Sequence, residues 1–473
     1  MTSDTPAAGR SLLRRELSFT DVLLFNIATV LGPRWIAAAA HNGPSSISLW
    51  VLAAVFFFVP TALVVVELST RFPTEGGLYV WTKEAFGDLH GFIAGWCYWI
   101  YTFFYFPGLL LASVAMSTFI GGPRFEWLNH DKRYLVGASL ALLAIAVALN
   151  IIGLNIGKWL QNAGGVGTYV PLLMLVALGG AAWWRHGSLT PITASSALPS
   201  WDWDTVNFWS QIAFAFTGLE LICAMSDEVK DPRRTFPRAI LVSGGLIAVI
   251  YLVGTLAVLA LLTPEQVDPR SGVFQAVGRG AAAIGLPWLG ILVAVLVTAG
   301  NAGGVGSTVA GISRVPMVVG IDRYLPAAFG AIHPRWRTPW IAMLVQAGIS
   351  AAILVASQVN ESVLSAYQIL VDAAIILYFI PFLYMYAAVI KLAYRADRAA
   401  DVRSVLMPGG RVGVWVIAGL AFAVTALSIV VSVVPPSGAN ALQFELKLLG
   451  GTAAAVSVGL ALYWRGARAK RQS

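Results

Sequence analysis

The stretch Asn26–Trp35 reads NIATVLGPRW and interrupts a long apolar run near the start of the chain. Pro33 removes a backbone donor and disfavours helix at the preceding glycine, and Arg34 adds a charge. A second apolar run is interrupted at 214–220, which reads FAFTGLE. Unwound backbone at membrane depth persists only where protein or a water-filled cavity satisfies it. The two stretches predict paired helix breaks, the sequence feature that points best to a transporter binding site.

Composition places both breaks in a membrane protein. Of the 473 residues, 58% are hydrophobic and only 11% are charged, whereas soluble domains carry about 25% charged residues. These values exclude a soluble globular chain and a disordered one. Six long stretches contain no Asp, Glu, Lys or Arg: 89–123, 159–184, 239–264, 280–313, 338–360 and 412–444. Continuous runs of this length predict membrane-spanning helices and not the alternating strands of a β-barrel.

The predicted fold is an all-α polytopic membrane protein with about twelve transmembrane helices. The broken spans are the first and the sixth, so they are five apart and suit a 5+5 inverted repeat followed by two further helices. The predicted divisions are an amino-terminal tail (1–20), a first repeat with spans 1–5 (21–184), a second repeat with spans 6–10 (205–390), spans 11–12 (411–464) and a carboxy-terminal tail (465–473).

The distribution of Lys and Arg predicts the orientation. On the side of the chain termini lie 22 of these residues, against 6 on the opposite side. The positive-inside rule then places both termini in the cytoplasm and the protein in the plasma (inner) membrane. The net charge of +8 reflects this asymmetry and contact with anionic lipid, not nucleic-acid binding.

Smaller features carry local predictions. Cys97 and Cys223 fall in apolar spans and are expected to be buried thiols. The scattered histidines and the two cysteines form no metal-binding pattern, and we expect no cofactor. Residues 75–86 are expected to lie along the cytosolic interface, and 271–283 to form an external gating helix. Gly300 and Gly304 have the spacing of a close helix-packing face and not of a phosphate loop.

Three polar segments between spans carry a resemblance to a known family. ELSTRFPTEGGLYVW (67–81) follows span 2, and EVKDPRRTFPRAI (228–240) follows span 6. DRYLP (322–326) follows span 8, with HPR (333–335) and TPW (338–340) after it. With the Phe-x-Gly-x-Glu pattern of span 6, the chain resembles the amino acid/polyamine/organocation (APC) transporters, amino acid permeases with a LeuT-type fold, from about residue 17 to residue 390.

The resemblance implies secondary transport of an amino acid by a permease or antiporter. Backbone amides at the span 1 break would bind the substrate carboxylate, and carbonyls at the span 6 break would bind its ammonium group. Spans 3, 8 and 10 would line the rest of the cavity. The residues expected to contact substrate are Thr29, Val30, Leu31, Gly32, Arg34, Phe214, Phe216, Thr217, Gly218 and Thr308.

Arg34 departs from the family pattern. Family members usually read Gly-Ser-Gly where this chain has Gly32-Pro33-Arg34, so only the first glycine matches. Because a charge at bilayer depth pairs or faces water, three interpretations stay open. Arg34 binds the carboxylate of the substrate, pairs internally with Glu220 or Asp372, or lines the outer vestibule.

Three further residues are candidates for gating or proton coupling. Glu220 matches the acid of the family pattern and is either a gate residue or a member of a static ion pair. Asp372 lies among apolar residues of span 10 and is either a proton site or a structural polar group. Phe214 is either a lid over the substrate or an ordinary packing residue.

The coupling ion is open. Some relatives carry a lysine in span 5 that replaces a sodium ion, and here that position holds Thr168. Sodium bound by Ser307 and Thr308, a charge supplied by Arg34, and exchange without an ion are the alternatives.

Other functions compete with amino acid transport. A polyamine or organic amine carrier is the main rival, and Arg34 argues against a cationic substrate. A membrane sensor would bind an amino acid without moving it, but the short loops offer no signalling domain. No nucleophile with a base, no metal site and no filter loop favours an enzyme or a channel.

Overall fold

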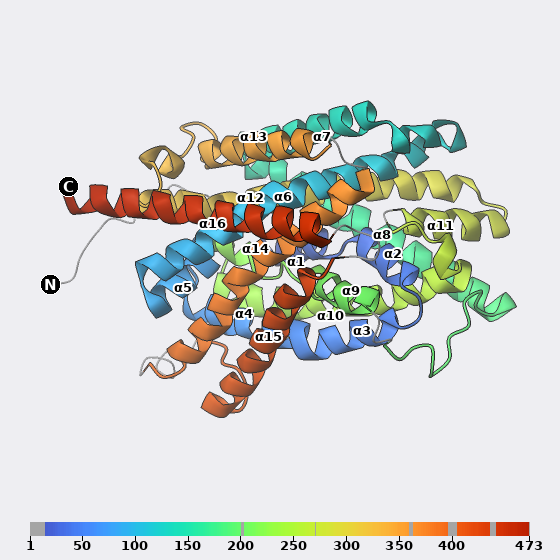
Figure 1. Ribbon diagram of the computed structural model, residues 1–473, viewed down its shortest axis with the longest axis horizontal. Helices are drawn as coiled ribbons and strands as arrows, with labels where there is room; N and C mark the ends of the chain where they lie inside the picture. The colour runs from blue at the N-terminus through green and yellow to red at the C-terminus, as the bar shows by residue number, and fades with distance from the viewer. Residues whose placement is uncertain are drawn as a thin grey trace.

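The computed structural model describes residues 15–199, 203–269, 271–358, 363–395, 404–435 and 441–472. The first fourteen residues of the predicted amino-terminal tail therefore lie outside the described residues. Figure 1 shows a bundle of helices that run mostly along the long axis of the molecule. The helices before the middle of the chain are α1 (Phe19–Val30), α2 (Pro33–His41), α3 (Ser46–Ala53), α4 (Val59–Arg71), α5 (Leu78–Phe86), α6 (Asp88–Ser117), α7 (Lys132–Ile152) and α8 (Leu154–His186).

The second half of the chain continues the bundle. Its helices are α9 (Trp203–Ala215), the 3-10 helix η5 (Leu221–Glu228), α10 (Pro232–Leu261), α11 (Gly272–Ala283), α12 (Trp288–Ile321), α13 (Trp340–Ser357), α14 (Val363–Leu392), α15 (Gly410–Ser432) and α16 (Ala441–Gln472). Within the described ranges, eleven helical segments are long and apolar enough to cross a membrane. The predicted sixth span is not among these eleven, because it is divided into α9 and η5 and neither piece is long enough to cross alone.

Both predicted helix breaks are present. Helix α1 ends at Val30, Leu31 and Gly32 are extended, and α2 begins at Pro33. Proline suits this first helical position because its missing N–H has no intrahelical partner there. In the sixth span, α9 ends at Ala215 and the helix resumes as η5, with Gly218 at a φ of 116° between them. A φ of this sign is open to glycine and strained for other residues.

Glycines bring α8 and α12 into close contact. A Cβ on Gly303 would lie 2.2 Å from the Cα of Gly164, and one on Gly304 would lie 2.8 Å from the carbonyl oxygen of Ala28. A Cβ on Gly300 would lie 2.9 Å from the backbone carbon of Gly167 in α8, so the expected packing role of Gly300 and Gly304 is confirmed, against α8 for the first and against α1 for the second. This contact places α12 directly behind the break in the first span.

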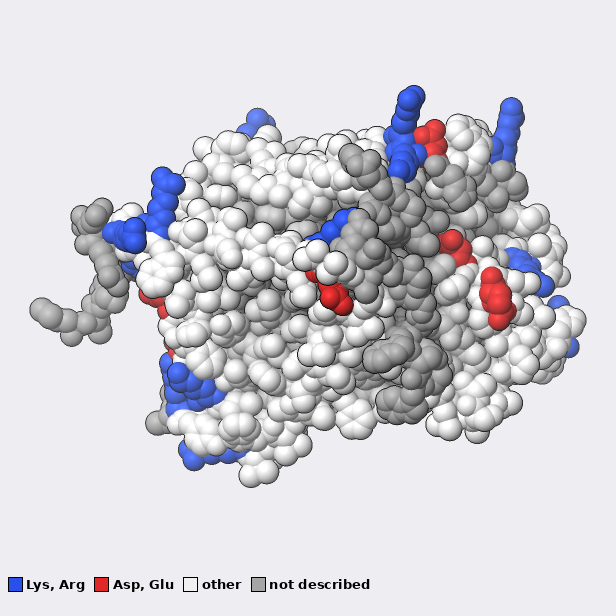
Figure 2. Space-filling view, viewed as in Figure 1, with Lys and Arg blue, Asp and Glu red and all other residues white. Residues whose placement is uncertain are grey.

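Two short helices lie in the segments 75–86 and 271–283, and the second of these was predicted to be helical. Helix α5 covers most of the segment 75–86, and α11 covers most of 271–283. Figure 1 places α5 at the end of the bundle where α16 terminates and α11 toward the opposite end. Most of the face in Figure 2 carries no charge, as expected of a belt that contacts lipid, and Lys and Arg side chains stand toward both ends of this face.

The α8–α12 contact yields a stability prediction. We expect Gly303→Ala to lower the thermal stability of the purified protein, because the added methyl group collides with backbone; overpacking of this kind costs about 1–3 kcal/mol. Gly348→Ala is the matched control, since its Cβ would meet open space in α13. Equal melting temperatures for the two variants would contradict the prediction.

Candidate substrate site

The hydroxyl of Tyr251 in α10 joins the two helix breaks. It accepts a hydrogen bond from the Gly32 N–H at 3.1 Å and lies 2.6 Å from the carbonyl oxygen of Val30 and 3.1 Å from that of Ala215. Its single proton is donated to one of these two carbonyls at a time. The first break and the second are thereby held to the same buried side chain.

Two small cavities lie next to the breaks. Each has a volume of about 20 Å³, which is space for little more than one water molecule. Trp35 and Tyr105 line both cavities and fill much of the space between the helices. The first cavity includes Val30, Leu31, Gly32, Arg34 and Asn301 in its lining, and the second includes Phe214, Thr217, Gly218, Thr308 and Tyr378. Thr29 borders both. The site in this conformation is contracted and closed around its own aromatic side chains.

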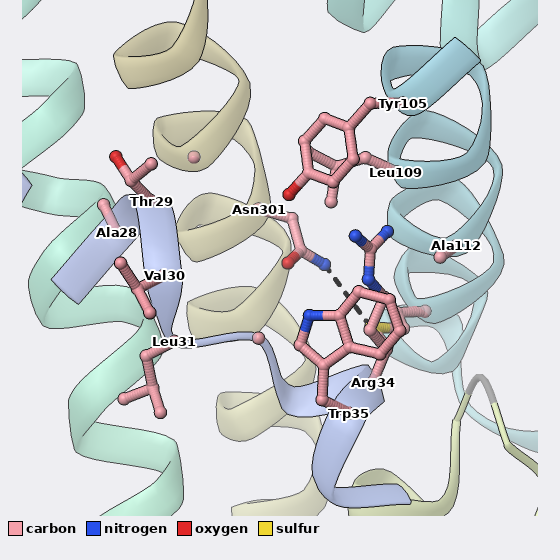
Figure 3. Close-up of a pocket in the computed structure, with 13 residues that line it drawn as sticks. Ala28, Thr29, Val30, Leu31, Arg34, Trp35, Tyr105, Leu109, Ala112 and Asn301 are labelled. Atoms are coloured by element: carbon pink, nitrogen blue, oxygen red, sulfur yellow. Dashed lines mark hydrogen bonds between the residues drawn. The ribbon is translucent and has the colours of Figure 1, made fainter. Parts of the chain in front are cut away.

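Arg34 is buried beside the first cavity, with 4% of the residue exposed. Its guanidinium carbon lies 4.4 Å from the ring centre of Trp35 and 5.1 Å from that of Tyr105. Figure 3 shows the guanidinium pointing toward Tyr105, next to the Trp35 indole. Among the described residues no carboxylate pairs with Arg34, and its buried Nη1 has no hydrogen-bond partner. The alternative of an internal pair with Glu220 or Asp372 is therefore not realised in this conformation.

Phe214 lies at the centre of an aromatic cluster. Its ring centre is 5.8 Å from that of Trp35, 6.0 Å from that of Tyr105 and 5.5 Å from that of Tyr378, each in an edge-to-face arrangement. These rings come from four different elements: α9, α2, α6 and α14. Space for a substrate between the breaks requires movement of this cluster.

Glu220 is buried one turn beyond the cavity and connects three elements. Its Oε1 accepts hydrogen bonds from the Tyr98 hydroxyl at 2.8 Å and from the Tyr378 hydroxyl, and its Oε2 accepts the Gly218 N–H at 3.1 Å. Tyr98 belongs to α6 and Tyr378 to α14. The carboxyl group therefore fixes the conformation of the break at Gly218 and attaches it to the two neighbouring spans.

Three other residues singled out by the sequence each carry a buried polar atom that has no hydrogen-bond partner in the described part of the chain. These atoms are Asp372 Oδ1 in α14, Thr29 Oγ1 at the end of α1 and Ser307 Oγ in α12. Thr308 instead donates to the Gly304 carbonyl of its own helix at 2.9 Å. Thr168 is buried on α8 against Gly300 of α12.

The structure brings most of the sequence-predicted substrate residues around the two cavities. Phe216 differs, because it stacks on Phe58 and meets Trp50 and Tyr251 edge-on, and it lines neither cavity. Sequence reasoning missed six aromatic residues at the site. Trp35, Tyr101 and Tyr105 line the cavities. Tyr98 and Tyr378 are the partners of Glu220, and Tyr251 connects the two breaks. The available signal was the tyrosine hydroxyls carried at depth in apolar spans, which need a partner when they are buried.

The fold and the site together define a class of membrane transporter. The chain aligns with the solved structure of MhsT in complex with L-phenylalanine at a TM-score of 0.64 and 14% identity, over 89% of this chain and 99% of that one. This likeness shows the LeuT-type fold. Two broken spans around a buried pocket fit that class.

The chain belongs to the amino acid permease family, whose model matches residues 17–449. An uncharacterized transporter of Legionella pneumophila is 28% identical over 443 residues, which is 93% of this chain and 94% of the relative. The serine/threonine exchanger SteT of Bacillus subtilis is 26% identical over 74% of this chain and 78% of its own length. A probable agmatine/putrescine antiporter of Lactococcus lactis, AguD, is 27% identical over 72% of each chain.

The protein is therefore an integral membrane transporter for an amino acid or amine, and its relatives are transporters and not enzymes. The domain boundaries and the individual site residues given above stay predictions.

The hydrogen bonds of the Tyr251 hydroxyl can be tested separately from the packing of its ring. We expect Tyr251→Phe to lower transport strongly and stability by about 1–3 kcal/mol, because buried backbone groups at the breaks lose their partner. Tyr386→Phe is the matched control, since Tyr386 is a buried tyrosine that bonds Thr61 away from the breaks. Radiolabelled uptake and thermal melting of both variants test this, and wild-type uptake by Tyr251→Phe would refute it.

Proposed function

We propose that the protein is a secondary active carrier that moves amino acids across the inner membrane by alternating access. The substrate is held between the break that separates α1 from α2 and the break that separates α9 from η5. Both chain termini lie on the cytosolic side, which the excess of Lys and Arg on that side supports.

Arg34 is the observation that carries the proposal. A guanidinium that is buried without an anion costs free energy, because it has lost water and gained no counter-charge. Its two aromatic neighbours offset part of that cost. A substrate carboxylate would supply the missing anion in the bidentate geometry that arginine favours.

The backbone around the pocket suits the two ends of an amino acid. Helix α2 directs its amino-terminal, positive dipole end at the break, where Leu31 and Gly32 border the first cavity. Thr217 and Gly218 border the second cavity at the carboxyl end of α9, where carbonyl groups lack helical partners. The carboxylate would then face α2 and Arg34, and the ammonium group would face α9. Thr29, Val30 and Thr308 complete the proposed contacts.

Gating is assigned to the groups that close the pocket. Phe214 would act as the lid, because its ring packs against Trp35, Tyr105 and Tyr378 over the second cavity. Glu220 would transmit movement of the break to α6 and α14 through its two tyrosine partners. Asp372 is the candidate for proton coupling within the membrane, because its buried carboxyl has an oxygen without a partner.

Counterflow in proteoliposomes tests the proposed function. Purified protein is reconstituted and offered a panel of labelled amino acids and amines, with and without imposed proton or sodium gradients. Saturable accumulation of one amino acid class supports the carrier and names its substrate. Accumulation of amines alone would contradict an amino acid substrate and indicate an amine carrier, the class of transporter for which AguD is named. Binding without accumulation would indicate a sensor.

The role of Arg34 gives a separate prediction. We expect Arg34→Ala to raise the KM for the transported amino acid by about 10- to 100-fold, the loss of one charged hydrogen-bonded contact. Arg34→Lys should fall between that variant and the wild type, because lysine keeps the charge but not the planar fork. Arg279→Ala is the control, since Arg279 is exposed on α11 and bonds Gln266. A folded Arg34→Ala protein with an unchanged KM would remove Arg34 from the site.

A further inference from the structure

A buried charge cluster lies at the α5 end of the bundle, apart from the substrate cavities. It consists of Glu75 in the loop after α4, Glu228 at the end of η5 and Arg314 in α12. The three residues are at most 1% exposed. Arg314 donates to Glu228 twice, from Nε at 3.0 Å and from Nη2 at 2.9 Å. This pair has the bidentate geometry of a strong ion pair.

Glu75 is the unmatched member of the cluster. Its Oε2 accepts the backbone N–H of Asp227 at 3.0 Å. Its Oε1 is buried without a hydrogen-bond partner, and the Nε of Arg314 lies 3.9 Å away. The guanidinium is already matched by Glu228, so an ionised Glu75 would be a second carboxylate on one cation.

The surroundings of Glu75 favour its neutral form. Burial and the nearby carboxylate of Glu228 raise the pKa of Glu75 well above its ordinary value, and Arg314 offsets only part of this. Asp227 adds further negative charge from η5. Glu16 adds negative charge beside Glu228. The cluster is therefore electrically balanced when Glu75 carries a proton.

The cluster is assembled by contacts that hold this end of the bundle together. The Gly76 N–H donates to the Ala224 carbonyl, and a Cβ on Gly77 would lie 3.0 Å from the Ala224 nitrogen, so the loop after α4 lies against η5. The segment before α1 is paired to the same element. The N–H groups of Glu16 and Leu17 donate to the Glu228 carbonyl, and the Lys230 N–H donates to Leu17. Movement of α1 away from the bundle would break this pairing.

We propose that Glu75 binds a proton from the cytosol when the cytosolic end of the carrier closes, and returns it to the cytosol when that end opens. The inference rests on the alternating access and the orientation proposed above. Because the proton is taken from and returned to the same side, Glu75 makes closure depend on cytosolic pH and does not drive transport, and it does not touch the substrate.

The sign of the pH effect follows from linkage. Water that enters on opening would return the Glu75 pKa toward its ordinary value of about 4.3. The closed form therefore binds more protons than the open form, and acid favours closure. Between the two pKa values, the open fraction should rise by up to about tenfold for each unit of pH increase.

Cys223 offers a direct reporter of opening. It is buried in η5, next to the glycine loop that carries Glu75, and Cys97 is the other cysteine of the chain. In a Cys97→Ser background, the rate of maleimide labelling of Cys223 is measured from about pH 5 to pH 8 in full-length protein with and without Glu75→Gln. The ratio of the two rates at each pH cancels the ionisation of the thiol itself.

At each pH, the labelling rate of the parent protein is divided by the labelling rate of the Glu75→Gln variant. We expect this ratio to rise by up to about tenfold for each unit of pH increase. Glu84→Gln is the control, because Glu84 is an exposed carboxylate of α5, and it should follow the parent protein. Glu228→Gln should also flatten the pH response, because the remaining carboxylate then becomes the partner of Arg314.

A ratio that stays constant with pH, or a Glu228→Gln protein with the parent pH response, would overturn the inference. Labelling needs no substrate, whereas counterflow by the unmodified protein reports carrier activity. The two proposals can therefore fail separately.

Discussion

The central constraint on this fold is the satisfaction of unwound backbone inside a membrane. Two spans give up helical hydrogen bonds at Leu31–Gly32 and at 216–220, where lipid offers no replacement. The hydroxyl of Tyr251 supplies the partner for both sites, and Glu220 supplies another for Gly218. Trp50 stacks on Tyr251 at 4.4 Å and Phe216 packs against its ring, which fixes the hydroxyl in place. The breaks are thus stabilised by side chains from neighbouring spans as much as by the glycines within them.

The same arrangement explains why the site is small in this conformation. Trp35 and Tyr105 contact the guanidinium of Arg34, and Phe214 packs on both rings. In the absence of a carboxylate, aromatic faces are the best available neighbours for a buried cation. An entering substrate would compete with these contacts, because a charged hydrogen bond to Arg34 replaces a weaker cation–π interaction. Substrate binding would therefore displace the aromatic side chains, because the guanidinium of Arg34 would exchange their rings for the substrate carboxylate.

The sequence predicted the fold better than the site because the two depend on different kinds of information. Long charge-free runs, the proline at 33 and the glycine at 218 act locally, so spans and breaks could be placed from the chain alone. Partner choice is not local. A pair of Arg34 with Glu220 or Asp372 is one of the alternatives that the sequence leaves open, but the Glu220 carboxyl group is satisfied by Tyr98 and Tyr378 from two distant spans. Phe216 is only two residues from Phe214, yet it faces Trp50 and Phe58 instead of the cavity. The pairing of Glu228 with Arg314 spans 86 residues and had no signal in either segment.

A short element connects the substrate site with the closed end of the bundle. Glu220 directly precedes η5, and Glu228 ends it. Tyr98 and Tyr378 hold the first residue, and Arg314 and the segment before α1 hold the last. The eight residues of η5 include a non-helical one, Met225 (φ −107°, ψ 30°), so its two ends are close in the chain but are joined through a kink. In the proposed mechanism, occupancy of the pocket and closure of the α5 end would act on this same short piece of backbone, as a carrier that opens to one side at a time requires.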